Sequence, residues 1–487
     1  MNDLTTSYLA KKIDGKLFGP EKTVQGIFTF LNKAKIGDVV IRHWIDPVGV
    51  EMANDKGVSC IITQNPKDNT VEKAIELNIP IIITSKIEKA NAFALKWSIE
   101  NFAKNAVSVV VTGTNGKSTT THMIHTILIR AGYNTYTNTD SKSEFNTLID
   151  PVVSDQVYEF KNLNTEKIDA MVFEVSEVQG WMDKLMKHHA SLMTTAINPN
   201  VLVLTNISLD HIGLVNSIEE TFNEIFETLK AFSKSNIGGY AILNSDDLLL
   251  RKMGETLSTE SNIIYYGSDV QDNIVPELNL RSEGIYLNNK LFLKTEQLPF
   301  KSKHFIQNTM AAIGACLALK IDHNTIKNGI SSYKPLERRF SVLSTHPLII
   351  DDFAHNPDGI TATIKSALKM SEGTLYIVFA IRGSRGDTIN LMNSEAVFEG
   401  IADENHVLVV TSSTEVVDNL NKVEASEKDA VLKVFGDNSI EYVFKEKLHD
   451  ALEYTIQAAS ENDTILLIGA QGMDPASEIL KSIINTH

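Results

Sequence analysis

The segment 112–121, Thr-Gly-Thr-Asn-Gly-Lys-Ser-Thr-Thr-Thr, lies between an apolar run at 108–111 and a stretch with the pattern of a helix at 122–131. A loop that leaves a strand and enters a helix directs successive backbone N–H groups, and the positive end of the helix, at one point. A phosphate group fits that point. The common phosphate-loop pattern begins with a glycine where this chain has Val111, but the shorter core Gly-x-x-Gly-Lys-Ser is present.

Each residue type in this loop suits a nucleotide phosphate. Gly113 and Gly116 allow the backbone to come close to the ligand. Lys117 is placed to meet the β- and γ-phosphates, and Ser118 or Thr119 is placed to bind Mg²⁺. The alternative is a turn of Gly, Asn and Ser that only joins a strand to a helix. The lysine and hydroxyl residues in register favour the phosphate loop.

The length and the net charge of the chain limit its number of domains and the classes of partner that it can bind. At 487 residues the chain is too long for a single hydrophobic core, and about 150 residues per domain suggests three domains. Hydrophobic residues make up 43% of the sequence and charged residues 22%, as in an ordinary globular protein. The formal net charge of -16 argues against general binding to nucleic acid or to an anionic membrane, because both carry negative charge.

Cys60 and Cys316 are the only cysteines of the sequence, and each lies in an apolar segment. Neither a disulfide framework nor a cysteine-based zinc site is therefore expected, and a reducing, cytoplasmic setting fits. The first 30 residues have no apolar core, and no run of about 18 apolar residues occurs in the sequence. Neither a signal peptide nor a membrane span is therefore predicted.

Short β-branched runs alternate with helical patterns along most of the sequence, which indicates parallel, doubly wound α/β sheets. Because the runs are continuously apolar, both faces of these strands are expected to be covered. One segment, 285–293, has Asn288-Asn289 at its centre and is expected to form a hairpin. The other predicted strands are 58–63, 79–84, 107–112, 170–175, 201–206, 241–244, 263–267, 348–353, 375–380, 406–411 and 464–470.

Polar residues follow two of the predicted strands near the loop. Glu174 and Ser176 stand at the end of one strand, and Asn206, Asp210 and His211 follow another. In an open parallel sheet, ligands bind outside the carboxyl ends of the strands, so these groups are expected to converge on the phosphate loop. Glu174 would hold Mg²⁺ through oxygen, and His211 would supply a nitrogen ligand to a second cation. A solvated turn or a helix cap is the alternative for each residue taken alone.

The order of these motifs resembles that of the Mur ligase family, ATP-dependent enzymes that join an amino acid or a peptide to a carboxylate. The loop at 112–119 is similar to the family's phosphate loop, and Glu174 stands where the family has its magnesium-binding Glu. The segments 206–211, Asn-Ile-Ser-Leu-Asp-His, and 244–247, Asn-Ser-Asp-Asp, resemble two further motifs of the family.

The resemblance continues along the rest of the chain. His304-x-x-x-Asn308, before a predicted helix, is similar to the element that faces adenine in the family, although Phe305 replaces its first Asn. Arg339 fits the arginine that opens the C-terminal domain and reaches the γ-phosphate. The segment 352–357, Asp-Phe-Ala-His-Asn-Pro, matches the family motif Asp-Tyr-Ala-His-Asn-Pro.

The resemblance implies a three-domain α/β protein that binds ATP and Mg²⁺. Its domains are expected at 1–105 for the nucleotide-linked peptide, at 106–335 for ATP in a doubly wound parallel sheet, and at 336–487 for the amino acid in a Rossmann-like fold. The expected catalytic residues are Lys117, Glu174, His211, Arg339 and His355, and the expected metal ligands are Ser118, Glu174 and His211. The expected nucleotide-binding residues are Gly113, Thr114, Asn115, Gly116, Lys117, Ser118, Thr119, His304, Asn308, Arg339 and Asp352.

In the mechanism that the resemblance implies, a substrate carboxylate attacks the γ-phosphate of ATP, and an amine captures the resulting acyl phosphate. The expected partners are a UDP- or other nucleotide-linked peptide and a free amino acid, and the protein is expected to be a monomer. Closure of the C-terminal domain over the nucleotide is expected to complete the site and exclude water. The product would be a precursor of a cell-wall polymer, murein or pseudomurein.

The first 105 residues resemble the N-terminal domain of the members that add the third residue or the dipeptide, through 35–41 and 53–62. Two family features are missing. The bacterial enzymes carry a carbamoylated Lys after the Asp-His motif, near the place where this chain has Glu224 and Glu227, either of which would supply the negative charge. A uridine-binding Thr-Asp-Ser-Arg is replaced near 29–31. The nearest likeness is to the archaeal pseudomurein peptide ligases of methanogens.

The expected amino-acid pocket also departs from the bacterial pattern. The Asp-Asn-Pro-Arg that selects diaminopimelate is replaced by 413–416, Ser-Thr-Glu-Val, and a Gly-Lys-Gly-His-Glu motif is replaced near 469–474. Because Val416 stands near the place of the Arg, diaminopimelate is expected to be rejected. Glu415 would pair with a lysine ammonium, so Lys is the expected substrate ahead of Ala and Glu.

Two other functions stay open on the sequence alone. One is a Mur-like ligase of cofactor or polyglutamate biosynthesis, whose mark would be an N-terminal region without a nucleotide-sugar pocket. The other is a non-catalytic ATP-binding subunit, which the joint presence of the five expected catalytic residues disfavours. An amidating relative with a four-Cys zinc ribbon is disfavoured by the two cysteines.

Overall fold

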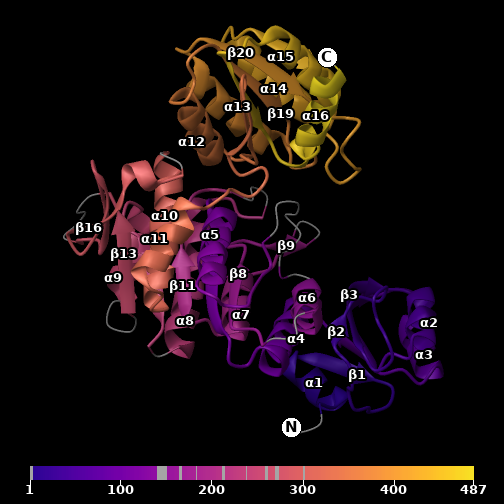
Figure 1. Ribbon diagram of the computed structural model, residues 1–487. Helices are drawn as coiled ribbons and strands as arrows, with labels where there is room; N and C mark the ends of the chain where they lie inside the picture. The colour runs from indigo at the N-terminus through magenta and orange to yellow at the C-terminus, as the bar shows by residue number, and fades with distance from the viewer. Residues whose placement is uncertain are drawn as a thin grey trace. The chain divides into compact units, whose positions relative to one another are not determined.

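The computed structural model describes residues 4–139, 148, 151–163, 167–181, 184–210, 214–236, 238–257, 262–268, 274–299 and 302–486 (Figure 1). The chain divides into two compact units. The first comprises residues 1–139, 143–207 and 213–333, and the second comprises 140–142, 208–212 and 334–487. The chain passes from the first unit to the second between Tyr333 and Lys334.

The N-terminal part of the first unit is built on a five-stranded sheet with the order β1-β5-β4-β3-β2. The strand β1 pairs antiparallel with β5, and the other pairs are parallel. The last helix of this part, α4, packs on two cores, because Ile87 and Ala90 face this sheet and Ala92 and Leu95 face the next one. The elements are α1 (Thr6–Lys12), β1 (Gly15–Phe18), β2 (Phe28–Thr29), β3 (Val39–Ile45), α2 (Pro47–Asp55), β4 (Cys60–Pro66), α3 (Thr70–Glu76), β5 (Ile81–Thr84) and α4 (Ile87–Phe102).

The rest of the first unit is built on a nine-stranded sheet with the order β16-β15-β14-β13-β12-β11-β6-β8-β7. The pairs from β7 to β14 are parallel, and β15 is antiparallel to its two neighbours, β14 and β16. Its strands are β6 (Val107–Thr112), β7 (Thr135–Thr137), β8 (Ala170–Glu174), β11 (Val201–Leu204), β12 (Tyr240–Asn244), β13 (Asn262–Gly267), β14 (Leu278–Arg281), β15 (Gly284–Leu287) and β16 (Lys290–Lys294). The accompanying elements are α5 (Lys117–Arg130), α6 (Val152–Leu163), the β9 (Gly180–Trp181) and β10 (Lys184–Leu185) pair, α7 (His189–Ile197), α8 (Ile218–Ser235), α9 (Leu248–Leu257), η1 (Thr295–Gln297), α10 (Lys303–Ala318) and α11 (His323–Ser331).

The central strand β6 is covered on both faces, as the sequence predicts. Val109 and Val111 are fully buried in a core shared with α5, α10 and α11. Val110 is fully buried on the opposite face, in a core shared with α7, α8 and α9. Burial of one valine side chain contributes roughly 1.5–3 kcal/mol. The strand that carries the phosphate loop is therefore held firmly from both sides.

The second unit is built on a six-stranded sheet with the order β17-β18-β22-β19-β20-β21. Only β17 is antiparallel, and it pairs with β18. Helices cover this sheet in the doubly wound manner that the sequence predicts (Figure 1). The elements are β17 (Ser341–Thr345), β18 (Leu348–Asp352), α12 (Pro357–Leu368), β19 (Leu375–Ala380), α13 (Asp387–Ile401), β20 (His406–Thr411), α14 (Ala425–Asp437), β21 (Tyr442–Lys445), α15 (Leu448–Ala458), β22 (Thr464–Ile468), η2 (Gln471–Met473) and α16 (Ala476–Thr486).

The α/β fold expected from the sequence is confirmed, and each predicted strand lies within two residues of an observed one at its start. The hairpin is confirmed as β15 and β16, with Asn288 and Asn289 at positive φ of 47° and 66°, as a tight hairpin turn requires. Two helices begin earlier than predicted, because α5 starts at Lys117 and α10 at Lys303. Within the described residues, no helix is long and apolar enough to cross a membrane.

We predict that the stability of the protein falls with acid because of His189. Its ring is buried at the start of α7, and burial lowers its pKa from 6.5 to about 4. The unfolded chain therefore takes up a proton below pH 6.5 that the folded chain refuses, so stability is lost as the pH falls from 6.5 towards 4. Between pH 7 and pH 5 this one group should cost about 1–2 kcal/mol. The His189→Gln variant should show a smaller drop in thermal unfolding midpoint over that range, measured by circular dichroism.

The exposed His323 supplies the control, and His323→Gln should keep the pH dependence of the unmodified protein. An equal acid-induced drop in the His189→Gln variant and in the unmodified protein would show that His189 does not contribute.

Candidate nucleotide-binding site

The loop between β6 and α5 uses two glycines at positions that no other residue would fill without strain. Gly113 has φ of 120°, and a Cβ there would stand 2.3 Å from Thr205 Oγ1. Gly116 has φ of 83°, and a Cβ there would stand 2.2 Å from Asn308 Oδ1. Both φ values lie in a region that side chains disfavour. The glycines therefore let the loop fold tightly against β11 and α10.

Asn206, two residues after β11, holds the loop in place through its side chain. Its Oδ1 accepts the N–H of Asn115 at 2.9 Å, and its Nδ2 donates to the carbonyl oxygen of Asn115 at 2.9 Å. Its own carbonyl oxygen accepts the N–H of Thr114 at 2.9 Å. The amide thus pairs with the loop as one strand pairs with another. The predicted convergence of 206 on the phosphate loop is present in the structure.

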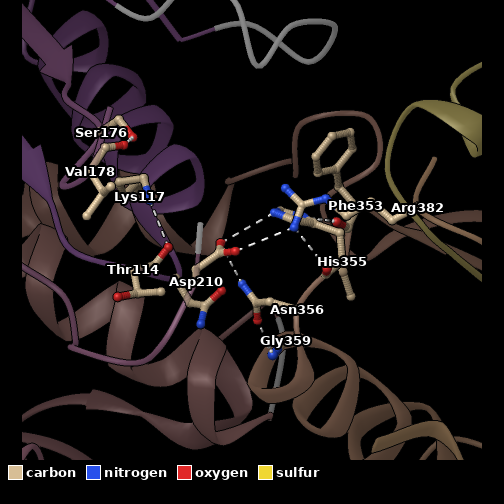
Figure 2. A network of polar contacts seen from close by, with 12 residues as sticks. Thr114, Lys117, Ser176, Val178, Asp210, Phe353, His355, Asn356, Gly359 and Arg382 are labelled. Carbon is tan, nitrogen blue, oxygen red and sulfur yellow. Dashed lines mark hydrogen bonds and ion pairs between the residues drawn. The ribbon is translucent and has the colours of Figure 1, made fainter. Parts of the chain in front are cut away.

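Lys117, the first residue of α5, turns its ammonium back over the loop. Its Nζ donates to the carbonyl oxygens of Gly113 at 2.7 Å and Thr114 at 2.8 Å. Figure 2 shows the contact with Thr114. The third contact of Nζ is with Glu177 Oε2, at 2.8 Å. The ammonium lies in the middle of the loop, where a phosphate would meet it.

Glu174 ends β8 directly beside the loop, because it pairs with Val111 in the sheet register. Its Oε1 accepts the hydroxyl of Ser118 at 2.9 Å, and its Oε2 accepts the hydroxyl of Thr139 at 2.9 Å. Asn138 holds the backbone of Glu174 with a pair of hydrogen bonds of 2.8 Å and 2.9 Å. A carboxylate and a hydroxyl oxygen at this spacing fit Mg²⁺, which takes few protein ligands and completes its shell with water and phosphate.

No group of three or more His, Cys, Asp or Glu residues is placed to hold a metal ion within the described part of the chain. His211, which the sequence predicts as a nitrogen ligand and a catalytic residue, lies outside the described residues. The oxygen pair of Ser118 and Glu174 is therefore the part of the predicted metal site that the structure describes.

The element 304–308 lies inside α10 rather than before it. Asn308 is buried, and its amide oxygen occupies the space above Gly116. Near the first turn of α10, Gln307 Nε2 donates to Asp246 Oδ2 at 2.9 Å. Asp246 also accepts the N–H of Ser268 at 2.8 Å. Thus Asn308 meets the phosphate loop, and its neighbour ties α10 to the 244–247 motif. The partly buried His304 stays a predicted nucleotide contact.

The second unit contains a buried polar network around Asp210, which belongs to its 208–212 segment (Figure 2). The Asp210 carboxylate accepts a hydrogen bond from Asn356 Nδ2 at 3.1 Å. It also lies 3.5 Å from Arg382 Nη1 and 3.6 Å from His355 Nε2. Asn356 Oδ1 in turn caps α12 by accepting the N–H of Gly359 at 2.9 Å. The buried carboxylate is thus paired with a cation and hydrogen-bonded, which buried charges require.

His355 has a defined orientation in this network. Its Nδ1 lies 2.7 Å from the carbonyl oxygen of Phe353, so Nδ1 carries the hydrogen and Nε2 faces Asp210. Asp352, at the end of β18, accepts the N–H of Ala354 at 2.9 Å and the hydroxyl of Thr363 at 3.1 Å. The motif 352–357 therefore folds into a rigid turn that positions His355.

The two adjacent arginines of the second unit differ in their surroundings. Arg338 is buried, and donates to Asp351 at 3.2 Å and to the carbonyl oxygen of Gly469 at 2.6 Å. Arg339 is half-buried, with its guanidinium carbon 4.6 Å from the ring centre of Phe353. Arg338 therefore holds the fold of the unit, and Arg339 stays the predicted phosphate contact.

Glu224 and Glu227 were considered as substitutes for the carbamoylated lysine. In the structure they contact His188 and Lys230, respectively. Glu224 is buried, its Oε2 accepts the N–H of His188 at 2.6 Å, and burial raises its pKa. Glu227 pairs with Lys230 at 2.7 Å, and this hydrogen bond lowers its pKa. The described contacts of Glu224 thus tie α8 to the turn before α7. The described contacts of Glu227 lie along α8.

Glu415 also has a structural contact that the sequence does not reveal. Its two carboxylate oxygens accept the N–H groups of Leu448 at 3.1 Å and His449 at 2.8 Å, at the start of α15. A carboxylate at a helix N-terminus is stabilised by the helix dipole. The basis for choosing Lys as the amino acid, a Glu415 side chain ready for an ammonium, is therefore weakened. Val416 packs against the core of the second unit.

Glu177, Thr139 and Arg382 are among the polar residues of these networks that were not singled out from the sequence. Arg382 follows β19 by two residues, so the rule that selected Glu174 at a strand end would also have found it. Thr139 likewise follows β7. Glu177 lies three residues after Glu174 and belongs to no local sequence pattern. Its contact with Lys117 could therefore be found only in the structure.

The fold and the loop define a phosphate-loop α/β protein, and comparison with known proteins identifies its family. Residues 111–316 match the Mur ligase middle domain, and residues 338–471 match the Mur ligase glutamate ligase domain. The chain belongs to the Mur ligase family, as the sequence motifs indicate, and is an ATP-dependent acid–amino-acid ligase by that membership.

Known proteins of the family are similar along most of the chain. One relative, the UDP-N-acetylmuramoyl-L-alanyl-D-glutamate--2,6-diaminopimelate ligase of Clostridium botulinum, is 25% identical over 86% of this chain and 83% of its own. The structure of Thermotoga maritima MurF ligase in complex with ADP has a TM-score of 0.66 at 16% identity, covering 95% of this chain and 98% of its own. A pseudomurein peptide ligase type C from Methanothermus fervidus has a TM-score of 0.58 at 19% identity, covering 92% of this chain and 95% of its own.

We predict that Asn206→Asp weakens the binding of ATP at least about tenfold, because one hydrogen bond to the loop becomes a contact between two oxygens. The added negative charge near the phosphates acts in the same direction. Isothermal titration calorimetry with MgATP measures the effect. The same change at the exposed Asn101, which donates to the carbonyl oxygen of Trp97, is the matched control. Equal affinities of the Asn206→Asp and Asn101→Asp variants would rule out the role of Asn206 in ordering the loop.

Proposed function

We propose that the protein joins an amino acid to a nucleotide-linked peptide precursor of a cell-wall polymer, with ATP and Mg²⁺ as cofactors. The observation that carries the proposal is the loop, in which Lys117 lies over the phosphate position and Ser118 meets Glu174. The family membership supplies the reaction class, and the similar diaminopimelate ligase supplies the substrate class. The nine-stranded sheet with its loop is the proposed ATP-binding domain.

The proposed reaction proceeds through an acyl phosphate. The substrate carboxylate attacks the γ-phosphorus, the bond from that phosphorus to the β-γ bridging oxygen breaks, and ADP leaves. The amine of the amino acid then attacks the acyl carbon, loses a proton and displaces phosphate. Lys117 and the loop N–H groups neutralise the transferred phosphoryl group, and Mg²⁺ held by Ser118 and Glu174 would supply further positive charge. Arg339 and His355 are proposed as further catalytic residues of this reaction.

We further propose domains at 1–105, 106–335 and 336–487 that bind the nucleotide-linked peptide, ATP and the amino acid, respectively. The sheets of the structure support this division, since each proposed domain contains one of the three large sheets. The likeness to the Methanothermus fervidus ligase supports a pseudomurein precursor as the acceptor. A monomeric state and a cytoplasmic location stay predictions.

We predict that turnover depends on the Lys117 ammonium. Lys117→Ala alone would remove a cation that pairs with the buried carboxylate of Glu177, which destabilises a fold. The double variant Lys117→Met/Glu177→Gln removes both charges and should fold, yet phosphate release from ATP should fall at least about a hundredfold. Circular dichroism checks the fold, and Lys104→Met, a change at an exposed lysine, is the control. A folded double variant with normal phosphate release would refute the proposed role of the loop.

We predict that diaminopimelate is a poor substrate, because Val416 stands near the place of the arginine that grips its distal carboxylate. Loss of the bidentate contact between an arginine and this carboxylate should lower the selectivity for diaminopimelate by orders of magnitude. Competition of Lys, Ala, Glu and diaminopimelate, with UDP-linked peptides as acceptors, measures the outcome by mass spectrometry. The product should carry one of the three simple amino acids. A product carrying mainly diaminopimelate would overturn the argument from Val416.

A further inference from the structure

The ammonium of Lys117 has three N–H donors, and all three are used within the protein. Two of them meet the carbonyl oxygens of Gly113 and Thr114, and the third meets Glu177. An ammonium has no further donor. A nucleotide phosphate that contacts Lys117 must therefore share or replace one of these partners. Of the three partners, only Glu177 carries a full negative charge, as the phosphate does.

Glu177 is well placed to act on Lys117 in this way. The Glu177 side chain is fully buried, whereas that of Lys117 is 14% exposed, so the carboxylate approaches the ammonium from the protein interior. The turn that carries Glu177 is fixed on one side by Glu174 in the β8 register. On the other side, the Ser176 hydroxyl donates to the carbonyl oxygen of Val178 at 2.7 Å (Figure 2). The carboxylate is therefore held at a fixed distance from the loop.

We propose that Glu177 competes with the terminal phosphates of ATP for the charge of Lys117, and so keeps the affinity for the triphosphate low. This inference rests on the proposed function, because it assumes that the loop binds ATP. The buried carboxylate attracts Lys117 and repels the phosphates, and both effects weaken binding. Glu177 thus acts on the nucleotide indirectly, through the charge of Lys117.

A purely structural ion pair would behave differently. If Glu177 served only to hold Lys117 in place, then its neutralisation would loosen the loop and weaken nucleotide binding. If it competes, then the same change tightens binding, and only for nucleotides that reach Lys117. The sign of the change, and its dependence on the number of phosphates, therefore separate the two roles.

The test is to measure the affinities of the full-length protein and its Glu177→Gln variant for MgATP, ADP and AMP by isothermal titration calorimetry. Gln has nearly the same shape as Glu and still accepts a hydrogen bond from Lys117, so the fold should be kept. We expect MgATP to bind about three- to tenfold more tightly to Glu177→Gln, with AMP unchanged. Glu177→Asp, which keeps the charge, should bind MgATP about as the unmodified protein does. Glu296→Gln, at an exposed position, is the control.

Unchanged or weaker MgATP binding by Glu177→Gln would overturn the inference, as would an equal gain for AMP, because AMP has no phosphate at the Lys117 position. An unmodified protein that binds no MgATP would instead overturn the proposed function. The two failures are therefore distinguished by the unmodified protein alone. Tighter MgATP binding by Glu177→Gln, together with unchanged MgATP binding by Glu177→Asp, supports the competition.

Discussion

The register of three neighbouring strands, β8, β6 and β11, is the constraint on which the candidate site depends. Val111 pairs with Glu174 on one side, and Thr112 pairs with Leu204 on the other. Since all three strands are parallel, their carboxyl ends meet at one edge of the sheet. A slip of one residue in either pair would turn every side chain of that strand to the opposite face. The apolar packing on both faces of β6 therefore fixes the place of the polar groups at its end.

Each unit contains a buried charge that is paired with a charge of opposite sign, although the chain as a whole is strongly acidic. Lys117 is paired with Glu177 in the first unit, and Arg382 with Asp210 in the second. Buried pairs of this kind contribute little net stability compared with apolar contacts, but removal of one partner is costly. The Asp210 pair has a geometric role, because Asp210 also lies beside His355.

The sequence predicted the sheet-forming runs and the loop because both have strong local patterns. It missed β1, β2, β7, β17 and β21, which are short and lie at the edges of their sheets, and the short strands β9, β10 and β14. It also missed β3, where Arg42 and His43 interrupt the apolar run. The site was predictable where a residue follows a strand, as Glu174 does. Contacts made across the chain, such as that of Glu415 with the start of α15, have no local pattern and needed the structure.

The hydrogen bonds from Lys117 to its own loop have a consequence for the thermodynamics of ligand capture. Because the side chain ties together the carbonyl groups of Gly113 and Thr114, and Asn206 holds the next residue, the protein's own hydrogen bonds order the loop. When a ligand binds to a preorganised loop, the loop loses little further conformational entropy. The binding enthalpy of the ligand is then available for discrimination between nucleotides rather than for folding the loop around them.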